Sequence, residues 1–178
     1  MTLASDPAGA GPAPVPGSLL IVWHSRTGAA RAMADAALSG ATAEIGHAAR
    51  MVAAVDAQAD DVLRSAGLLF VCPENLGALT GEMKAFFDRT YYALLARIEG
   101  RAYATAIAAG TAGQGAEAQL DRIVTGWRLR RVAPSLIVRL GADTPAAIAA
   151  PKRLSGNDRQ TCRDLGRSLA AGLQIGVF

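Results

Sequence analysis

The sequence has few aromatic residues, few potential metal ligands and no long apolar run. Aromatic residues make up 5% of the 178 residues, and there are two cysteines and two histidines. Apolar stretches fall far short of the ~20 residues that a membrane-spanning helix needs, and the His and Cys residues lack metal-ligand spacing. Hydrophobic residues nevertheless form 51% of the chain. This composition predicts a soluble domain whose helices and sheet pack closely, with no bound metal.

The first 18 residues differ in composition from the rest. They contain repeated Pro and Gly residues and a single charge at Asp6. Because such a segment buries too little surface to offset its ordering entropy, we expect a flexible tail at residues 1–18 and one domain at residues 19–178. The segment lacks the basic and apolar regions of a secretory signal. We therefore expect a cytoplasmic protein without a membrane association.

The charge is mildly basic, with a formal net charge of +3. The densest basic run is Arg128, Arg130 and Arg131, just after a predicted helix. A cationic helix C-terminus explains this run, whereas a nucleic-acid surface would need a longer basic stripe with aromatic residues. We expect no nucleic-acid partner.

Strand-like apolar runs alternate with helical patterns along the chain. The predicted strands are 19–23, 43–50, 67–72, 103–108 and a strand within 132–140. The predicted helices are 30–38 (ended by Gly40), 59–66, 80–94, 116–127 and 157–173. This alternation predicts an α/β fold: a three-layer, doubly wound, parallel five-stranded sheet of order 2-1-3-4-5. In that topology, ligands bind at the carboxyl ends of the strands, next to strands 1 and 3.

Three loops reach that edge, and the first follows the strand at 19–23. Ser25 and Thr27 offer hydroxyl groups, and Gly28 permits close approach to the first turn of the next helix. Such a loop suits a phosphate, because the first N–H groups of a helix are free. It equally suits an N-cap whose hydroxyls only satisfy the helix start. His24 has two interpretations, packing within the loop or a place near a cofactor.

The segment 23–28, Trp-His-Ser-Arg-Thr-Gly, resembles the aromatic-Ser-x-Thr-Gly loop of flavodoxins and flavodoxin-like reductases. In that family this loop wraps the phosphate of FMN. The resemblance implies a flavodoxin-like fold and these FMN contacts: His24, Ser25, Arg26, Thr27, Gly28 and Ala29. The family usually continues with Asn-Thr, where this chain has Ala29 and Ala30. Because two side-chain donors are missing, a third possibility is that the chain is a member of this family that no longer binds flavin.

The second loop and the helix after it, residues 73–89, carry the longest match. They are similar to NAD(P)H-dependent FMN reductases and to tryptophan-repressor-binding-protein-like quinone reductases, which have Pro-x-x-x-Gly followed by a Met/Leu-Lys-x-Phe-hydrophobic-Asp-Arg helix. In those proteins the loop backbone runs along the isoalloxazine ring. The resemblance therefore implies that the flavin is bordered by Pro73, Glu74, Asn75, Leu76, Gly77 and Ala78.

The third loop, residues 109–115, is rich in glycine. It resembles the family's strand-4 loop, where small residues let the backbone lie against the flavin. The residues implied are Ala109, Gly110, Thr111, Gly113 and Gly115. The buried position predicted for Cys72 favours packing over nucleophilic chemistry, and no catalytic side chain is identified.

Two functions remain in view. One is an FMN-dependent NAD(P)H oxidoreductase that passes electrons to a quinone or similar small acceptor. The other is a flavodoxin-type electron carrier for redox partner proteins. The positive charge and the absence of aromatic residues from the second and third loops favour the reductase. By resemblance alone, we also expect a homodimer or homotetramer.

Overall fold

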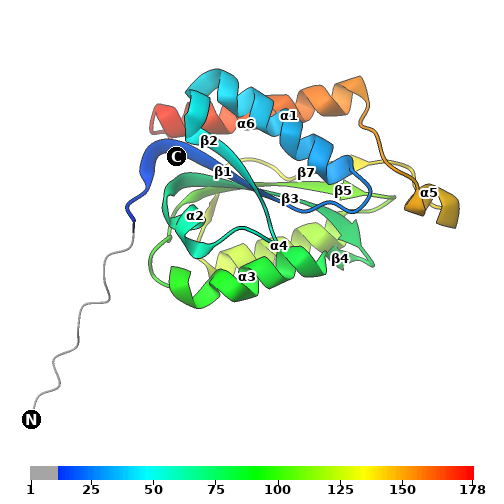
Figure 1. The fold of residues 1–178 in the computed structure, drawn as a ribbon, viewed down its shortest axis with the longest axis horizontal. Helices are drawn as coiled ribbons and strands as arrows, with labels where there is room; N and C mark the ends of the chain where they lie inside the picture. Colours follow the sequence, from blue (N-terminus) through cyan, green and yellow to red (C-terminus); the bar gives the residue numbers. More distant parts are fainter. Residues whose placement is uncertain (1–11) are drawn as a thin grey trace, which may run out of the picture.

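Three apolar runs form the central strands of a sheet that is covered by helices on both faces (Figure 1). The structure is a computed structural model, and it describes residues 12–178. Its elements are β1 (Val15–Trp23), α1 (Ala29–Ile45), a 3-10 turn (Gly46–Ala48), β2 (Ala49–Ala53), α2 (Ala59–Leu63), β3 (Ser65–Asn75), β4 (Ala78–Leu79), α3 (Gly81–Leu94), β5 (Ala102–Ala109), α4 (Gln114–Gly126), β6 (Arg130–Arg131), β7 (Leu136–Arg139), α5 (Pro145–Ala149) and α6 (Gly156–Gln174).

The strand order confirms the doubly wound topology. The sheet runs β2-β1-β3-β5, and β6 and β7 both pair with the outer edge of β5, all in parallel. Within residues 12–178 the sheet has seven strands rather than the predicted five. One addition is β4, which pairs antiparallel with the end of β3. The other arises because the fifth strand is split, and Pro134, which has no N–H to donate, lies between its two parts.

The alternation of side chains along β1 builds two cores. Leu19 and Ile21 pack against α1 and α6, whereas Leu20 and Val22 pack against the face covered by α2, α3 and α4. Figure 1 shows α1 and α6 above the sheet and α3 and α4 below it. The lower core contains the aromatic cluster of Phe70, Phe86, Phe87 and Trp127, and the upper core is rich in alanine. The helix predicted at residues 80–94 is present as α3, and its buried residues are Met83, Phe86, Phe87, Thr90 and Leu94.

Two glycines allow α1 and α6 to touch. A Cβ on Gly40 would lie 1.9 Å from the carbonyl oxygen of Arg163, and a Cβ on Gly166 would lie 2.0 Å from that of Ala37. The prediction that Gly40 ends the first helix is therefore wrong. The helix continues to Ile45, because Gly40 serves the contact between helices and Gly46, with φ of 54°, ends it.

Other boundaries also differ from the prediction. The segment 43–50, predicted as a strand, holds the end of α1 and the 3-10 turn, and β2 begins only at Ala49. The first strand begins at Val15, so the domain starts before residue 19, and the rest of the expected tail, residues 1–11, lies outside the described residues. The last helix begins at Gly156, one residue before the predicted start, and it is capped by Ser155, whose hydroxyl accepts the Asp158 N–H. Within residues 12–178, no helix is long and apolar enough to span a membrane.

Candidate functional site

A cavity of about 570 Å³ lies where β1, β3 and β5 end, which is the edge that the topology predicts. Its volume is typical of small-molecule sites. The predicted residues that line it are Ser25, Arg26, Thr27, Ala29, Pro73, Glu74, Asn75, Leu76, Gly77, Ala109, Gly110 and Thr111. The predicted residues outside its lining are His24, Gly28, Ala78, Gly113 and Gly115. All three predicted loops therefore meet at one cavity.

The first turn of α1 opens at this cavity, and no side chain in the described part of the chain caps it. The Ser25 hydroxyl accepts the N–H of Gly28, the residue that precedes the helix, at 3.1 Å. Gly28 adopts φ of 97°, a left-handed conformation that glycine adopts without strain. The N–H groups of the first helical turn have no partner within the helix. The loop hydroxyls thus do not cap the helix, and an anion site at its N-terminus fits the geometry better than the N-cap reading.

The connection after β3 is a hairpin rather than the predicted loop. Glu74 pairs with Leu79 and Asn75 with Ala78, which directs Ala78 into the ladder of β4 and away from the cavity lining. The tip residues Leu76 and Gly77 have φ of 52° and 70°, as in the tight turns that close β-hairpins. The Leu76 side chain at this tip is fully exposed, although it borders the cavity. The hairpin therefore places an aliphatic side chain at the edge of the cavity.

The carboxylate of Glu74 joins this hairpin to the first turn of α4. Its Oε2 accepts the Gly113 N–H at 2.6 Å, and its Oε1 accepts the Gly115 N–H at 2.9 Å and the Ala116 N–H at 3.3 Å. These bonds explain why Gly113 and Gly115 lie behind the cavity wall instead of lining it. In contrast to α1, α4 already has an anion at its N-terminus.

His24 lies beside the cavity and faces α3. Its Nδ1 lies 2.9 Å from the Thr80 hydroxyl, and its Nε2 lies 3.6 Å from Glu82. Burial lowers the pKa of His24, and Arg26 acts in the same direction against the opposing effect of Glu82. These contacts favour the loop-packing interpretation of His24. Arg26 also pairs with Glu82, at 3.2 Å, so this cluster joins the first loop to the start of α3.

One wall of the cavity comes from the connection between β7 and α6, where the sequence predicted no site residue. The lining residues that were not predicted are Ala30, Ala108, Leu140, Ala142, Ile148 and Lys152. Lys152 donates its backbone N–H to the Thr27 carbonyl at 2.7 Å. Its Nζ donates to the carbonyls of Ala147, Ile148 and Ala150 at 2.5 to 3.0 Å, which holds α5 in place. The available signal was topology, because the end of the fifth strand reaches the same edge.

Side chains suited to covalent or metal chemistry do not gather in the described part of the chain. Burial raises the pKa of the Cys72 thiol to about 12 and that of Cys162 to about 11. Both thiols are therefore neutral packing groups at physiological pH. Residues 12–178 contain no group of His, Cys, Asp and Glu that would hold a metal ion. The cavity is suited to binding an organic ligand rather than to acid–base or nucleophilic catalysis by its own side chains.

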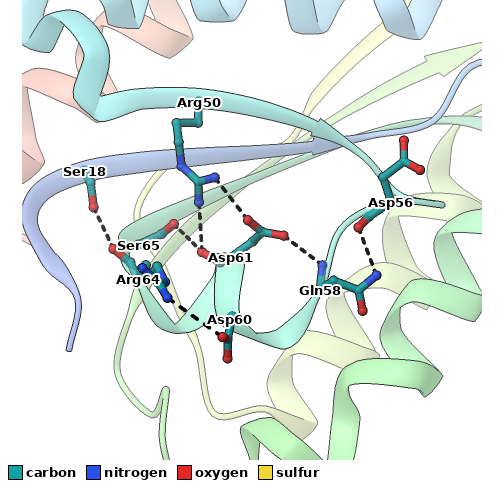
Figure 2. A network of polar contacts seen from close by, with 8 residues as sticks. All are labelled: Ser18, Arg50, Asp56, Gln58, Asp60, Asp61, Arg64 and Ser65. Carbon is teal, nitrogen blue, oxygen red and sulfur yellow. Dashed lines mark hydrogen bonds and ion pairs between the residues drawn. The ribbon is translucent and has the colours of Figure 1, made fainter. Parts of the chain in front are cut away.

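A second depression, of about 650 Å³, lies beside α2 at the outer edge of the sheet. Figure 2 shows Arg50 reaching from β2 to Asp61 on α2, with an Nη1–Oδ1 distance of 3.1 Å. Asp61 also accepts the Gln58 N–H at 2.9 Å, and Arg64 approaches Asp60 at 4.0 Å. Since these charges pair with one another on an open surface, this depression is not a comparable ligand site.

Comparisons with known proteins agree with the fold. The family described as NADPH-dependent FMN reductase matches residues 32–140, more than half of the chain. A protein named flavodoxin from Aquifex aeolicus is 30% identical over 166 residues, which cover 90% of this chain and 89% of that protein. The chain has a flavodoxin-like fold and belongs to the NADPH-dependent FMN reductase family, as the motifs at 23–28 and 73–89 implied.

Two solved structures illustrate the shared fold. A flavodoxin from the domain Archaea superposes with a TM-score of 0.71 at 17% identity and covers 88% of this chain and 99% of its own. A flavodoxin described as WrbA-like, from Agrobacterium tumefaciens, superposes with a TM-score of 0.63 at 18% identity and covers 89% and 98%. At these identities the likeness concerns the fold alone.

Proposed function

We propose that the protein binds FMN in the cavity at the ends of β1, β3 and β5 and acts as an NAD(P)H oxidoreductase. The uncapped N-terminus of α1, which opens into this cavity, is the observation that carries the proposal. Its N–H groups and the Thr27 hydroxyl would hold the phosphate, and the helix dipole would favour its negative charge. Ala29 and Ala30 remove side-chain donors from the loop but leave these backbone donors in place.

The other two loops would border the flavin ring. The hairpin tip at residues 74–77 and the segment at residues 109–111 lie on the cavity wall, and their small or aliphatic residues leave space for a flat ring. Bound FMN would supply the redox chemistry, taking a hydride from NAD(P)H and delivering electrons to the acceptor. The protein would contribute binding and orientation.

An open flavin face favours an enzyme over a carrier. Among residues 12–178, none of the side chains that line the cavity is aromatic, so no aromatic ring covers a bound flavin. Hydride transfer requires contact at about 3–3.5 Å, and therefore access for a nicotinamide. We propose a quinone or similar small molecule as the acceptor. The relative named flavodoxin favours the alternative, an electron carrier for partner proteins.

Anaerobic stopped-flow spectroscopy of the FMN-loaded protein tests the reductase. NADH or NADPH should bleach the flavin absorbance within seconds, and a benzoquinone should then restore it. Bleaching by a low-potential electron donor but by neither nucleotide would replace the reductase with the carrier.

We further propose a homodimer or homotetramer. Tyr92 on α3 is 82% exposed, and its ring lies 5.2 Å from that of Tyr91. Tyr92 is therefore not part of the core and is available for a contact between subunits. Light scattering on the purified protein tests this part, because a monomeric mass at micromolar concentration would contradict it.

A further inference from the structure

Glu74 has an unusual place for a carboxylate. It stands at the carboxyl end of β3, half-buried on the cavity wall, and no basic side chain pairs with it in the described structure. Its partners are instead backbone N–H groups of Gly113, Gly115 and Ala116, with a shortest distance of 2.6 Å. Three charge-assisted bonds to one carboxylate form a strong tie between two segments that are far apart in the sequence.

The tie holds two surfaces in direct contact. A Cβ on Gly115 would lie 2.0 Å from the Gly77 carbonyl oxygen, so the hairpin tip and the start of α4 already touch. A second bond supports the same contact, because the Leu79 N–H donates to Gln119 on α4 at 3.0 Å. The position of the hairpin therefore depends on α4, and Glu74 is the charged group that links them.

The same carboxylate distinguishes the two helix N-termini near the cavity. Glu74 accepts from the first N–H groups of α4, whereas among residues 12–178 no side chain accepts an N–H of the first turn of α1. A ligand phosphate would meet a fixed negative charge at α4 and free donors at α1. Like charges disfavour binding at the first position, and free donors favour it at the second.

We propose that Glu74 is a positioning residue for the flavin. It sets the spacing between the β3–β4 hairpin and the loop before α4, the two walls that would border the ring, and it closes α4 to the phosphate. This inference rests on the proposed binding of FMN. Glu74 acts by holding the backbone of the two loops and by placing its negative charge on the cavity wall, and it takes no part in proton or electron transfer.

The variant Glu74→Gln tests the inference, with Glu117→Gln as the matched control. Glu117 also lies in the first turn of α4, and its side chain makes no hydrogen bond or ion pair in the described structure. In Glu74→Gln, FMN and riboflavin should both bind about tenfold more weakly, because the walls of the ring site move and the phosphate site does not. In Glu117→Gln, both affinities should stay within about twofold. Wild-type affinities for both flavins in Glu74→Gln would overturn the inference.

A redox measurement separates positioning at the ring from a general structural role. Since Glu74 places a negative charge on the cavity wall, its removal should favour reduced over oxidised FMN by about threefold, roughly 14 mV for a two-electron couple. If the ratio of the affinities for reduced and oxidised FMN is unchanged in Glu74→Gln, Glu74 does not lie at the ring, and the inference is overturned.

Hydrogen exchange on the flavin-free protein keeps the inference testable if FMN does not bind. The N–H groups of Gly113, Gly115 and Ala116 should exchange at least tenfold faster in Glu74→Gln than in Glu117→Gln. Unchanged exchange would overturn the inference by itself. Failure of the wild-type protein to bind either flavin, with exchange changed as expected, would refute the proposed function and leave the tie between the loops standing.

Discussion

The backbone N–H of Lys152 donates to the carbonyl of Thr27 at 2.7 Å. This bond ties the connection after β7 to the loop before α1, which forms the candidate phosphate site. The two residues are far apart in sequence but share one wall of the cavity. The ammonium group of Lys152 places a positive charge on this wall. Its three bonds to the carbonyls of Ala147, Ile148 and Ala150 fix the position of the ammonium group. Lys152 is therefore expected to support phosphate binding both electrostatically and through α5.

Replacement of Lys152 by Met should weaken FMN binding about tenfold, or about 1.4 kcal/mol. The substitution removes a positive charge near the phosphate and releases α5 from its three bonds. Riboflavin, which lacks the phosphate, should lose less affinity. Fluorescence titration with both flavins measures the difference. Lys84→Met is the control, since Lys84 pairs with Asp88 on the surface of α3, and equal affinities in both variants would contradict the role of Lys152.

The network around Asp121 should make stability depend on pH. The Asp121 carboxylate accepts a bond from the Tyr103 hydroxyl and pairs with Arg131 at 2.7 Å. The bond from Tyr103, followed by Arg131, lowers the pKa of Asp121 below its usual 3.8. Because the folded-state pKa is lowered, this stabilisation is present above the unfolded pKa and is lost as the pH falls through the folded-state value.

The variant Asp121→Asn should consequently lose about 1–2 kcal/mol at pH 7, a figure reduced for the partial exposure of the pair. The difference from wild type should narrow below pH 3.8 and disappear below the lowered pKa. Urea unfolding at a series of pH values measures it. Asp35→Asn, which removes a surface ion pair with Arg31, should change stability by less than about 0.5 kcal/mol. A pH-independent loss in Asp121→Asn would contradict the assignment.

A Gly→Ala substitution should have opposite effects on stability at Gly40, which lies in the contact between α1 and α6, and at Gly126, which lies at the end of α4. Gly40→Ala places a Cβ 1.9 Å from the Arg163 carbonyl oxygen and should cost at least about 2–3 kcal/mol. Gly126→Ala meets nothing within 4 Å and should be neutral or stabilising by up to about 1 kcal/mol. Urea denaturation compares them, and a wild-type midpoint for Gly40→Ala would show that the helices do not touch there.

Hydrophobic pattern was sufficient to predict the central strands and the edge of the sheet where the cavity lies. The runs around Ile21, Leu69 and Ala106 are typical of buried strands, and their carboxyl ends determine where the three loops meet. The motif at residues 73–89 further identified the segment that borders the cavity and α3, although not the hairpin that this segment forms. These features depend on local sequence, and for that reason they were predicted correctly.

Features that depend on contacts between distant segments were not predicted. The sequence around Gly40 predicts the end of a helix, but Gly40 instead allows close contact with Arg163 on another helix. The same is true of Glu74, whose role depends on the first turn of α4, and of Lys152, which lies in a segment with only the five-residue helix α5. No local pattern carries such information.

The affinity of the flavin-free protein for FMN, compared with its affinity for riboflavin, tests the location of the phosphate at the N-terminus of α1 most directly. Isothermal titration calorimetry at one ionic strength measures both affinities on the same preparation. The free N–H groups of α1 and the neighbouring Lys152 predict that FMN binds about ten- to a hundredfold more tightly, from charge-assisted bonds of about 1.5–3 kcal/mol. Equal affinities for FMN and riboflavin would contradict a phosphate site at α1.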